Sequence, residues 1–159
     1  MRTFIARALG ILLMVLPLSC KDRMCCAIVD VGVDVYVKDQ SGNNLMDPST
    51  SGFYDQTGIK LFDLDNGVRT QLFNTNTNRY TIVQEGKDVF LRIFPKEPST
   101  NSEITRTTYI QWRTNDEDVI ESTLSKSKDS SHCTKVKCNG TVKYDSQTAS
   151  SRRVVEIIK

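Results

Sequence analysis

Thiol and imidazole side chains are the groups in this 159-residue chain whose spacing could support chemistry. They are Cys20, Cys25, Cys26, His132, Cys133 and Cys138. A Cys–His nucleophilic pair needs the imidazole within hydrogen-bond reach of the sulfur. Neighbouring residues of an extended chain point to opposite faces, so His132 is badly placed to activate Cys133. No G-x-S-x-G motif is present either, and the chain is therefore expected not to be an enzyme.

Metal sites are also disfavoured. The cysteines and His132 are ligand types that suit zinc, but neither cysteine pair has C-x-x-C spacing. The stretches DLDNG (63–67) and NDED (115–118) resemble fragments of calcium loops. Neither supplies both the glycine at position 6 and the glutamate at position 12 that an EF-hand needs, so both are expected to be solvated turns. No metal and no cofactor is predicted.

The first nineteen residues have the features of a secretory signal. Arg2 and Arg7 precede the apolar block ALGILLMVLPL, residues 8 to 18, which ends at Ser19. This block is shorter than the roughly 20 apolar residues that a membrane-spanning helix needs. The sequence therefore predicts export of the chain, with residues 1–19 removed.

The junction after the apolar block resembles a bacterial lipobox, in which a small residue precedes a cysteine that is acylated. Ser19 and Cys20 fit that junction, whereas Pro17 stands where leucine is usual. The resemblance implies that Cys20 is the mature N-terminus and carries palmitate-type acyl chains as a lipid anchor. Each buried methylene of these chains would add about 0.8 kcal/mol of membrane affinity, so the attachment would be effectively permanent. Residues 20–26 would then be a lipidated tether and residues 27–159 a single domain.

Charge disfavours nucleic acid as a partner. The whole chain has 21 basic and 19 acidic residues, and the signal contains two of the basic ones and none of the acidic. The mature chain is therefore formally neutral, without the basic surplus that a nucleic-acid surface requires. Its 140 residues suit one domain with a hydrophobic core of its own.

The hydrophobic pattern of the mature chain predicts strands. In AIVDVGVDVYVKD the valines at 29, 31, 33, 35 and 37 alternate with Asp30, Gly32, Asp34, Tyr36 and Lys38, which predicts one strand with a buried odd face and a solvated even face. Further strands are predicted at 59–64, 68–73, 80–84, 89–94, 107–113, 119–124, 134–138, 141–144 and 153–158.

Turn signals separate these strands. Asn-Gly at 66–67 and at 139–140 predicts two-residue hairpins, and EGKD (85–88) is a less specific signal of the same kind. Longer loops are expected at 46–58 and 95–102. Many short strands at close spacing predict an all-β fold, an antiparallel β-sandwich of Ig-like or related type.

The remaining four cysteines are candidates for a disulfide. Cys133 and Cys138 would lie about 16 Å apart on opposite faces of a continuous strand, too far for a bond with each other. A bond between Cys25 and Cys26 would strain the peptide that joins them. We therefore expect a bridge between the two clusters, which would close a loop of over 100 residues and contribute up to ~4.7 kcal/mol.

Four stretches of the mature chain resemble a group of small lipoproteins of gut and oral Gram-negative anaerobes. They are VYVKDQSGNNLMDPST (35–50), IKLFDLDNG (59–67), TYIQWRTNDEDVIE (108–121) and KVKCNG (135–140). The resemblance implies an Ig-like β-sandwich tethered to the outer membrane. Only Asp22 is acidic directly after Cys20, which leaves the periplasmic and the outer face both open.

Two classes of function remain. The first is a non-catalytic binding or accessory module that holds a protein or glycan partner on its loops, with Phe53 and Tyr54 of the 46–58 loop as the candidate surface. The second is a structural or envelope-assembly component that pairs through exposed strand edges.

Overall fold

The computed structural model describes residues 28–73, 79–149 and 152–159. Eleven β-strands are assigned in these ranges. They are β1 (Ile28–Asp30), β2 (Val33–Lys38), β3 (Lys60–Asp65), β4 (Val68–Leu72), β5 (Tyr80–Glu85), β6 (Asp88–Ile93), β7 (Glu103–Arg113), β8 (Asp116–Lys126), β9 (Ser130–Cys138), β10 (Thr141–Asp145) and β11 (Val154–Ile158). In the described part of the chain no helix is long and apolar enough to span a membrane.

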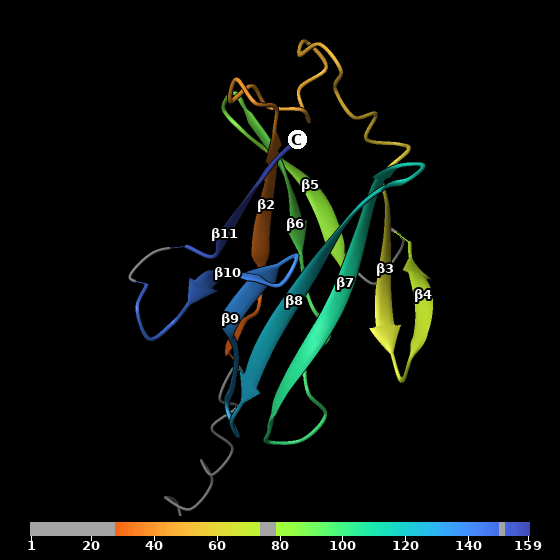
Figure 1. Cartoon of the computed structure of the whole chain (residues 1–159). Helices are drawn as coiled ribbons and strands as arrows, with labels where there is room; N and C mark the ends of the chain where they lie inside the picture. Colours follow the sequence, from red (N-terminus) through yellow and green to blue (C-terminus); the bar gives the residue numbers. More distant parts are fainter. Residues whose placement is uncertain (1–27, 74–78, 150–151) are drawn as a thin grey trace, which may run out of the picture.

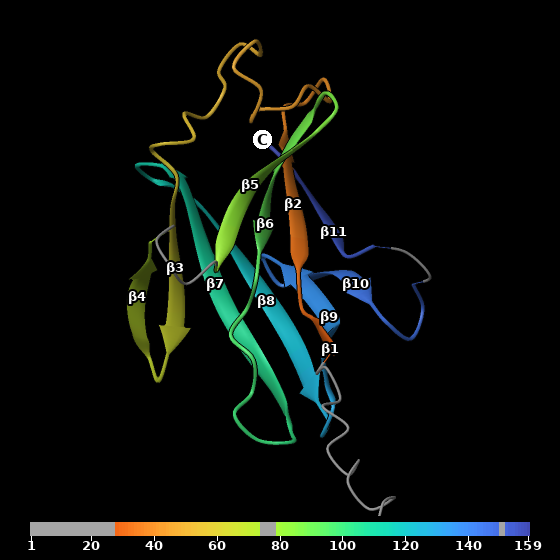
Figure 2. The same cartoon turned by 180° about the vertical axis from the view of Figure 1, so that it is seen from behind.

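The strands form two sheets that pack against each other (Figure 1, Figure 2). The large sheet has the order β1-β9-β8-β7-β3-β4, and β10 also pairs with β9. The small sheet has the order β11-β2-β6-β5. This architecture confirms the predicted all-β sandwich. Most neighbours are antiparallel, but β1 with β9 and β11 with β2 are parallel pairs.

Hairpins form where the turn residues predict them. Asn66-Gly67 and Asn139-Gly140 join β3 to β4 and β9 to β10, and all four residues have positive φ angles between 49° and 80°. Asparagine and glycine tolerate this left-handed backbone, which matches the twist of the flanking strands. Gly86, with a φ of 64°, likewise turns β5 into β6.

The predicted strand around 29–37 is two strands in different sheets. β1 pairs with β9 in the large sheet, whereas β2 begins at Val33 and pairs with β6 and β11 in the small sheet. The chain changes sheet at Val31 and Gly32, as strands at the corners of sandwiches do. Val29 is consequently 53% exposed on an edge strand, and its predicted burial is wrong.

The core lies between the two sheets and uses alternate residues of the long strands. Its fully buried side chains include Val33, Val35, Val37, Leu61, Leu91, Ile110, Trp112, Ile120 and Leu124. Each comes from the inward face of its strand because successive side chains alternate between faces.

The two ends of the sandwich differ (Figure 1). We call one the loop end: it carries the loop 39–59 and the turns at 85–88 and 113–116. The other is the β1 end: it carries β1, the turns at 65–68 and 126–130, and the segment 94–102. The chain enters the described fold at one end and presents its longest loop at the other.

Candidate functional site

The loop 39–59 is built from turns that acidic side chains stabilise. Asp39, Asp47 and Asp55 each accept a backbone N–H from the residue two positions later, at 2.8–2.9 Å. Hydrogen bonds favour the ionised form of all three carboxylates and lower their pKa. For Asp39 the bonds from the side chain and backbone of Asn43 matter most, and for Asp47 and Asp55 the bonds from Ser49 and Thr57 do. The loop therefore has a defined conformation set by its own sequence.

Tyr54 fixes this loop to the sandwich. Of the two residues predicted to form the binding surface, Phe53 and Tyr54, the prediction for Tyr54 is therefore wrong. Its side chain is only 4% exposed, its ring stacks on Trp112 with 5.4 Å between centroids, and its hydroxyl donates to Asp116 Oδ2 at 2.6 Å. The ring is buried because it fills the space beside Trp112, so it cannot be offered to a partner. Phe53, at 40% exposed, remains available.

A polar network centred on the buried side chain of Asp118 lies at the loop end. Asp118 accepts hydrogen bonds from Trp112 Nε1 at 2.6 Å and from Asn139 Nδ2 at 2.7 Å. Lys159 Nζ lies 2.6 Å from both Asp116 and Asp118. Because Lys159 follows β11 of the small sheet and the two aspartates belong to β8 of the large sheet, this network joins the two sheets at the loop end.

The protonation states within this network fit a structural role. Burial, followed by the hydrogen bond to Asp116, raises the pKa of Tyr54 far above neutrality, so its phenol stays protonated. Burial alone would raise the pKa of Asp116, but the hydrogen bonds from Lys159 and Tyr54 outweigh it and hold that pKa below its usual value. Burial would also lower the pKa of Lys159, whereas its contacts with Asp116 and Asp118 raise it. The network therefore offers no free base or nucleophile.

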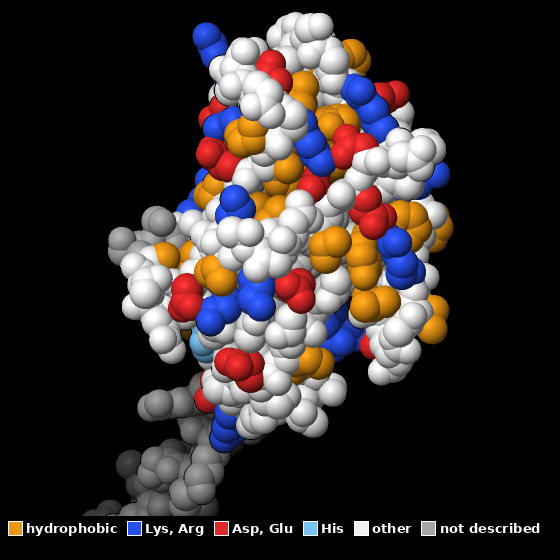
Figure 3. Space-filling model, viewed as in Figure 1, with side chains coloured by type: hydrophobic (Ala, Val, Ile, Leu, Met, Phe, Trp, Pro, Cys, Tyr) orange, Lys and Arg blue, Asp and Glu red, His pale blue; other side chains and the backbone are white. Residues whose placement is uncertain are grey.

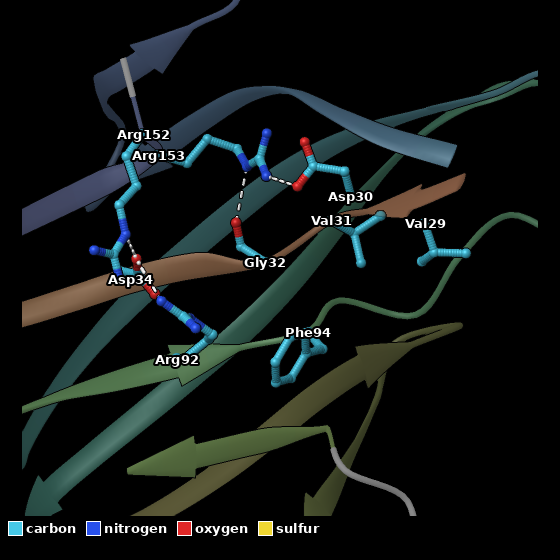
Figure 4. Close-up of a pocket in the computed structure, with 9 residues that line it drawn as sticks. All are labelled: Val29, Asp30, Val31, Gly32, Asp34, Arg92, Phe94, Arg152 and Arg153. Atoms are coloured by element: carbon cyan, nitrogen blue, oxygen red, sulfur yellow. Dashed lines mark hydrogen bonds and ion pairs between the residues drawn. The ribbon is translucent and has the colours of Figure 1, made fainter. Parts of the chain in front are cut away.

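A second charged cluster surrounds Asp34, which the alternation pattern places on a solvated face (Figure 4). Its side chain is instead only 5% exposed. Arg92 donates to it from Nε at 2.5 Å, and Arg152 donates to its other carboxylate oxygen. Arg152 also donates to Glu85 at 3.1 and 3.2 Å. Two guanidinium groups thus cover Asp34, and the prediction that it is solvated is wrong.

Beside this cluster is a cavity of about 300 Å³, lined in part by Arg153. Arg153 donates to the carbonyl oxygen of Gly32 at 2.8 Å and to the carboxylate of Asp30 (Figure 4). Every guanidinium of the cavity is therefore already paired with a carboxylate of the chain. This pairing attaches the start of β11 to β1 and β2, and it leaves little unbalanced charge for a ligand.

Cys133 and Cys138 are both buried on the core side of β9, at 1% and 4% exposed, and neither forms a disulfide with another described residue. The prediction that they lie on opposite faces is wrong, because β9 contains a bulge. Consecutive residues of β8 pair with Lys135 and Cys133, which leaves Thr134 as an extra residue and brings both thiols to the same face. Burial raises the pKa of Cys133 to about 11, so this thiol is protonated and unreactive at neutral pH.

The register of β1 limits which cysteine of β9 could form the predicted disulfide. Cys20, Cys25 and Cys26 lie outside the described residues, but Ile28 pairs with Ser130. Cys138 lies more than about 20 Å further along β9. The two or three residues that separate Cys25 and Cys26 from Ile28 span at most about 11 Å. A disulfide needs Cα atoms within about 7 Å, so Cys138 is out of reach of both. A bridge to Cys133 stays a prediction.

His132, the remaining candidate metal ligand, does not form a metal site with the other described residues. His132 is exposed on β9, opposite Asp30 and Ser125. Among the described residues no group of three or more His, Cys, Asp or Glu side chains is arranged to hold a metal ion.

A hollow of about 450 Å³ lies on the outer face of the small sheet, beside the loop end. Sequence reasoning missed it. The strand pattern assigned Tyr36 only to a solvated face, although a large aromatic residue among Asp and Lys neighbours was a signal that this face has a particular role.

Comparison of the chain with known proteins found no match: no family model, no curated protein and no solved structure.

Proposed function

We propose that the chain is an outer-membrane lipoprotein anchored through Cys20, whose β-sandwich is a non-catalytic module that binds a protein or glycan partner. The observation that carries the proposal is the arrangement of the two ends of the fold. β1 begins eight residues after Cys20 and lies at the end of the sandwich opposite the loop 39–59 (Figure 1). A lipid anchor at Cys20 would therefore direct the loop end away from the bilayer.

The loop end has the properties of a prepared contact surface. Phe53 is 40% exposed, and the backbone carbonyls of Gly52 and Phe53 accept hydrogen bonds from Arg113. Arg113 also lies over the ring of Tyr54, 4.6 Å from its centroid. Exposed aromatic side chains on loops held by a rigid scaffold are common anchors of binding. Little conformational entropy would be lost when a partner contacts this end.

Charge is distributed in a way that fits a selective contact. Lys and Arg side chains are interspersed with Asp and Glu over the face seen in Figure 3. A mixed surface of this kind favours a partner recognised by shape and hydrogen bonds over one attracted by bulk charge.

The proposal is tested by site-specific photocrosslinking in cells. A benzophenone amino acid in place of Phe53 is expected to give a discrete crosslinked product, either a protein band or a periodate-sensitive glycan conjugate. The same group in place of Asp129, an exposed residue of the β1 end, is the control and should give none. Crosslinks from position 129 alone, or from neither position, would contradict the proposal.

A second candidate function is favoured by the edge of the large sheet. β4 is the last strand of that sheet. Its first residue, Val68, is 64% exposed, and Phe73, directly after the strand, is 60% exposed. An exposed apolar edge strand can pair with a strand of another chain, as an envelope-assembly component would. A benzophenone at position 73 separates the two functions, because strand pairing would move the crosslink from position 53 to position 73.

A further inference from the structure

The outer face of the small sheet carries an aromatic pair at its centre. Tyr36 of β2 stacks on Phe90 of β6 with 4.7 Å between ring centroids and 23° between ring planes. Phe90 is fully buried even though it points away from the core. Arg92 and Arg152 cover it, with their guanidinium carbons 5.4 and 5.1 Å from its centroid. Phe90 thus supports the ring of Tyr36 from one side and holds it in place.

Tyr36 lines the hollow of about 450 Å³ described above. Lys38 of the same strand also lines it, and three further segments form the rest of its wall. They are the turn that begins the loop 39–59, through Gly42 and Asn44; the start of β6, through Asp88; and β11, through Val154 and Glu156. The hollow lies within the range of about 300–1,000 Å³ that is usual for small-molecule sites. Its position beside the turn at Gly42 makes it continuous with the loop end.

Polar groups with unused hydrogen-bonding capacity surround the ring of Tyr36. Glu156 accepts from Lys38 Nζ through one carboxylate oxygen. Its other oxygen and two ammonium protons of Lys38 make no hydrogen bond to the described side chains. Asp88 makes no side-chain hydrogen bond or ion pair with the described residues. Burial is the main reason that the pKa of Tyr36 is raised, so its hydroxyl remains a donor at neutral pH. Donors and acceptors therefore stand side by side around one aromatic face.

The chemistry of this hollow selects among ligand classes. Two carboxylates and one ammonium group give its wall a net negative charge, which disfavours phosphate, sulfate and carboxylate ligands. Its polar rim would have to lose water without compensation if an apolar ligand entered. A neutral sugar ring avoids both costs, because it carries no negative charge and can hydrogen-bond to the polar rim. Its C–H face carries partial positive charge that suits the negative face of an aromatic ring, and its hydroxyls both donate and accept hydrogen bonds.

We propose that the hollow is a sugar-binding subsite, in which a neutral pyranose ring stacks on Tyr36 and its hydroxyls hydrogen-bond to Asp88, Glu156 and Lys38. This inference rests on the proposed function of the chain as a binding module and names a glycan as the partner of the face next to the loop end. The ring of Tyr36, supported by the buried ring of Phe90, is the stacking platform of this subsite.

The test uses the lipidated chain in nanodiscs and a set of neutral methyl glycosides of glucose, galactose, mannose and N-acetylglucosamine. Saturation-transfer NMR should detect at least one of them, with millimolar affinity, and amide shifts should centre on Tyr36, Asp88 and Glu156. Inorganic phosphate and sialic acid serve as anionic probes and should bind more weakly. Absence of binding by every neutral glycoside, or tighter binding of the anions, would overturn the inference.

Variants of the platform sharpen this test. Tyr36→Leu keeps an apolar contact with Phe90 but removes the aromatic face, and it should weaken glycoside binding by about tenfold. Tyr36→Phe should retain most of the affinity. The matched control is Tyr109→Leu, a half-buried tyrosine on the outer face of the large sheet, which should have no effect. Equal binding by wild type and Tyr36→Leu would contradict the stacking arrangement.

The polar rim is tested separately, in case Tyr36→Leu fails to fold. Asp88 is exposed and its side chain makes no hydrogen bond or ion pair with the described residues, so Asp88→Ala should fold normally. It should still lower glycoside affinity, and unchanged affinity would count against the subsite. If no sugar binds but position 53 still crosslinks, the sugar subsite is wrong and the binding module stands. If sugar binds at Tyr36 but position 53 gives no crosslink, the subsite stands and the loop-end contact is wrong.

Discussion

Replacing Asp118 by alanine should lower the free energy of unfolding by about 3–5 kcal/mol. Asp118 is 3% exposed and is the shared acceptor of Trp112, Asn139 and Lys159. Without it, the indole N–H and the amide of Asn139 lose their partner inside the fold, and the Lys159 ammonium keeps only Asp116. Removing a shared acceptor costs more than its bonds contribute, because the indole N–H of Trp112, which is 1% exposed, stays desolvated without a partner.

Urea denaturation followed by circular dichroism measures this effect. Asp129→Ala is the matched control, since Asp129 is an exposed aspartate in the turn between β8 and β9, and it should change stability by no more than about 0.5 kcal/mol. A loss below about 1 kcal/mol for Asp118→Ala would mean that the network at the loop end is not what joins the two sheets.

Val33→Asp should abolish cooperative folding. Val33 is completely buried in the core, so the substitution places a carboxylate between the sheets with no described partner. The cost of burying an unpaired charge is comparable to the whole stability of a domain, about 5–15 kcal/mol. Near-ultraviolet circular dichroism and the dispersion of amide NMR signals would report the loss. A folded Val33→Asp chain would contradict the assignment of this face to the core.

Asp34→Val is the companion substitution at the next position along β2. It removes the acceptor shared by Arg92 and Arg152, and it leaves two guanidinium groups of like charge close together over Phe90. Both arginines are partly exposed, at 29% and 44%, so water compensates much of the loss. We expect a destabilisation of about 1–2 kcal/mol. Stability equal to wild type would indicate that the ion pairs contribute nothing.

The features of the fold that could be predicted from sequence are those encoded by neighbouring residues. Asn66-Gly67 and Asn139-Gly140 determine their own turns, because few other residues accept positive φ at both positions. The alternating valines of β2 likewise place a core face correctly, since the side-chain period of a strand is two. The sandwich follows from many such local signals in succession.

The features that sequence reasoning missed depend on residues far apart in the chain. Asp34 is buried because Arg92 and Arg152, 58 and 118 residues away in the chain, cover it. No residue near Asp34 in the sequence indicates that they will do so. Tyr54 is buried because its ring packs on Trp112 and its hydroxyl donates a hydrogen bond to Asp116, 62 residues later. The bulge at Thr134 shifts the register of β9 without a proline or glycine to mark it, which is why the faces of Cys133 and Cys138 were misassigned.

The central claim is that an anchor at Cys20 holds the β1 end at the membrane and the loop end away from it. Paramagnetic relaxation by a gadolinium-chelating lipid in nanodiscs tests this claim in one NMR spectrum of the lipidated chain. Amide signals of the β1 end, such as those of Gly67, Ser127 and Asp129, should broaden. Signals of the loop end, such as those of Gly42, Ser49 and Asn115, should remain sharp, because strands of up to 11 residues separate the two ends by roughly 35 Å. In the Cys20→Ala chain neither set should broaden. Broadening of the loop-end signals, or equal broadening with and without Cys20, would contradict the account.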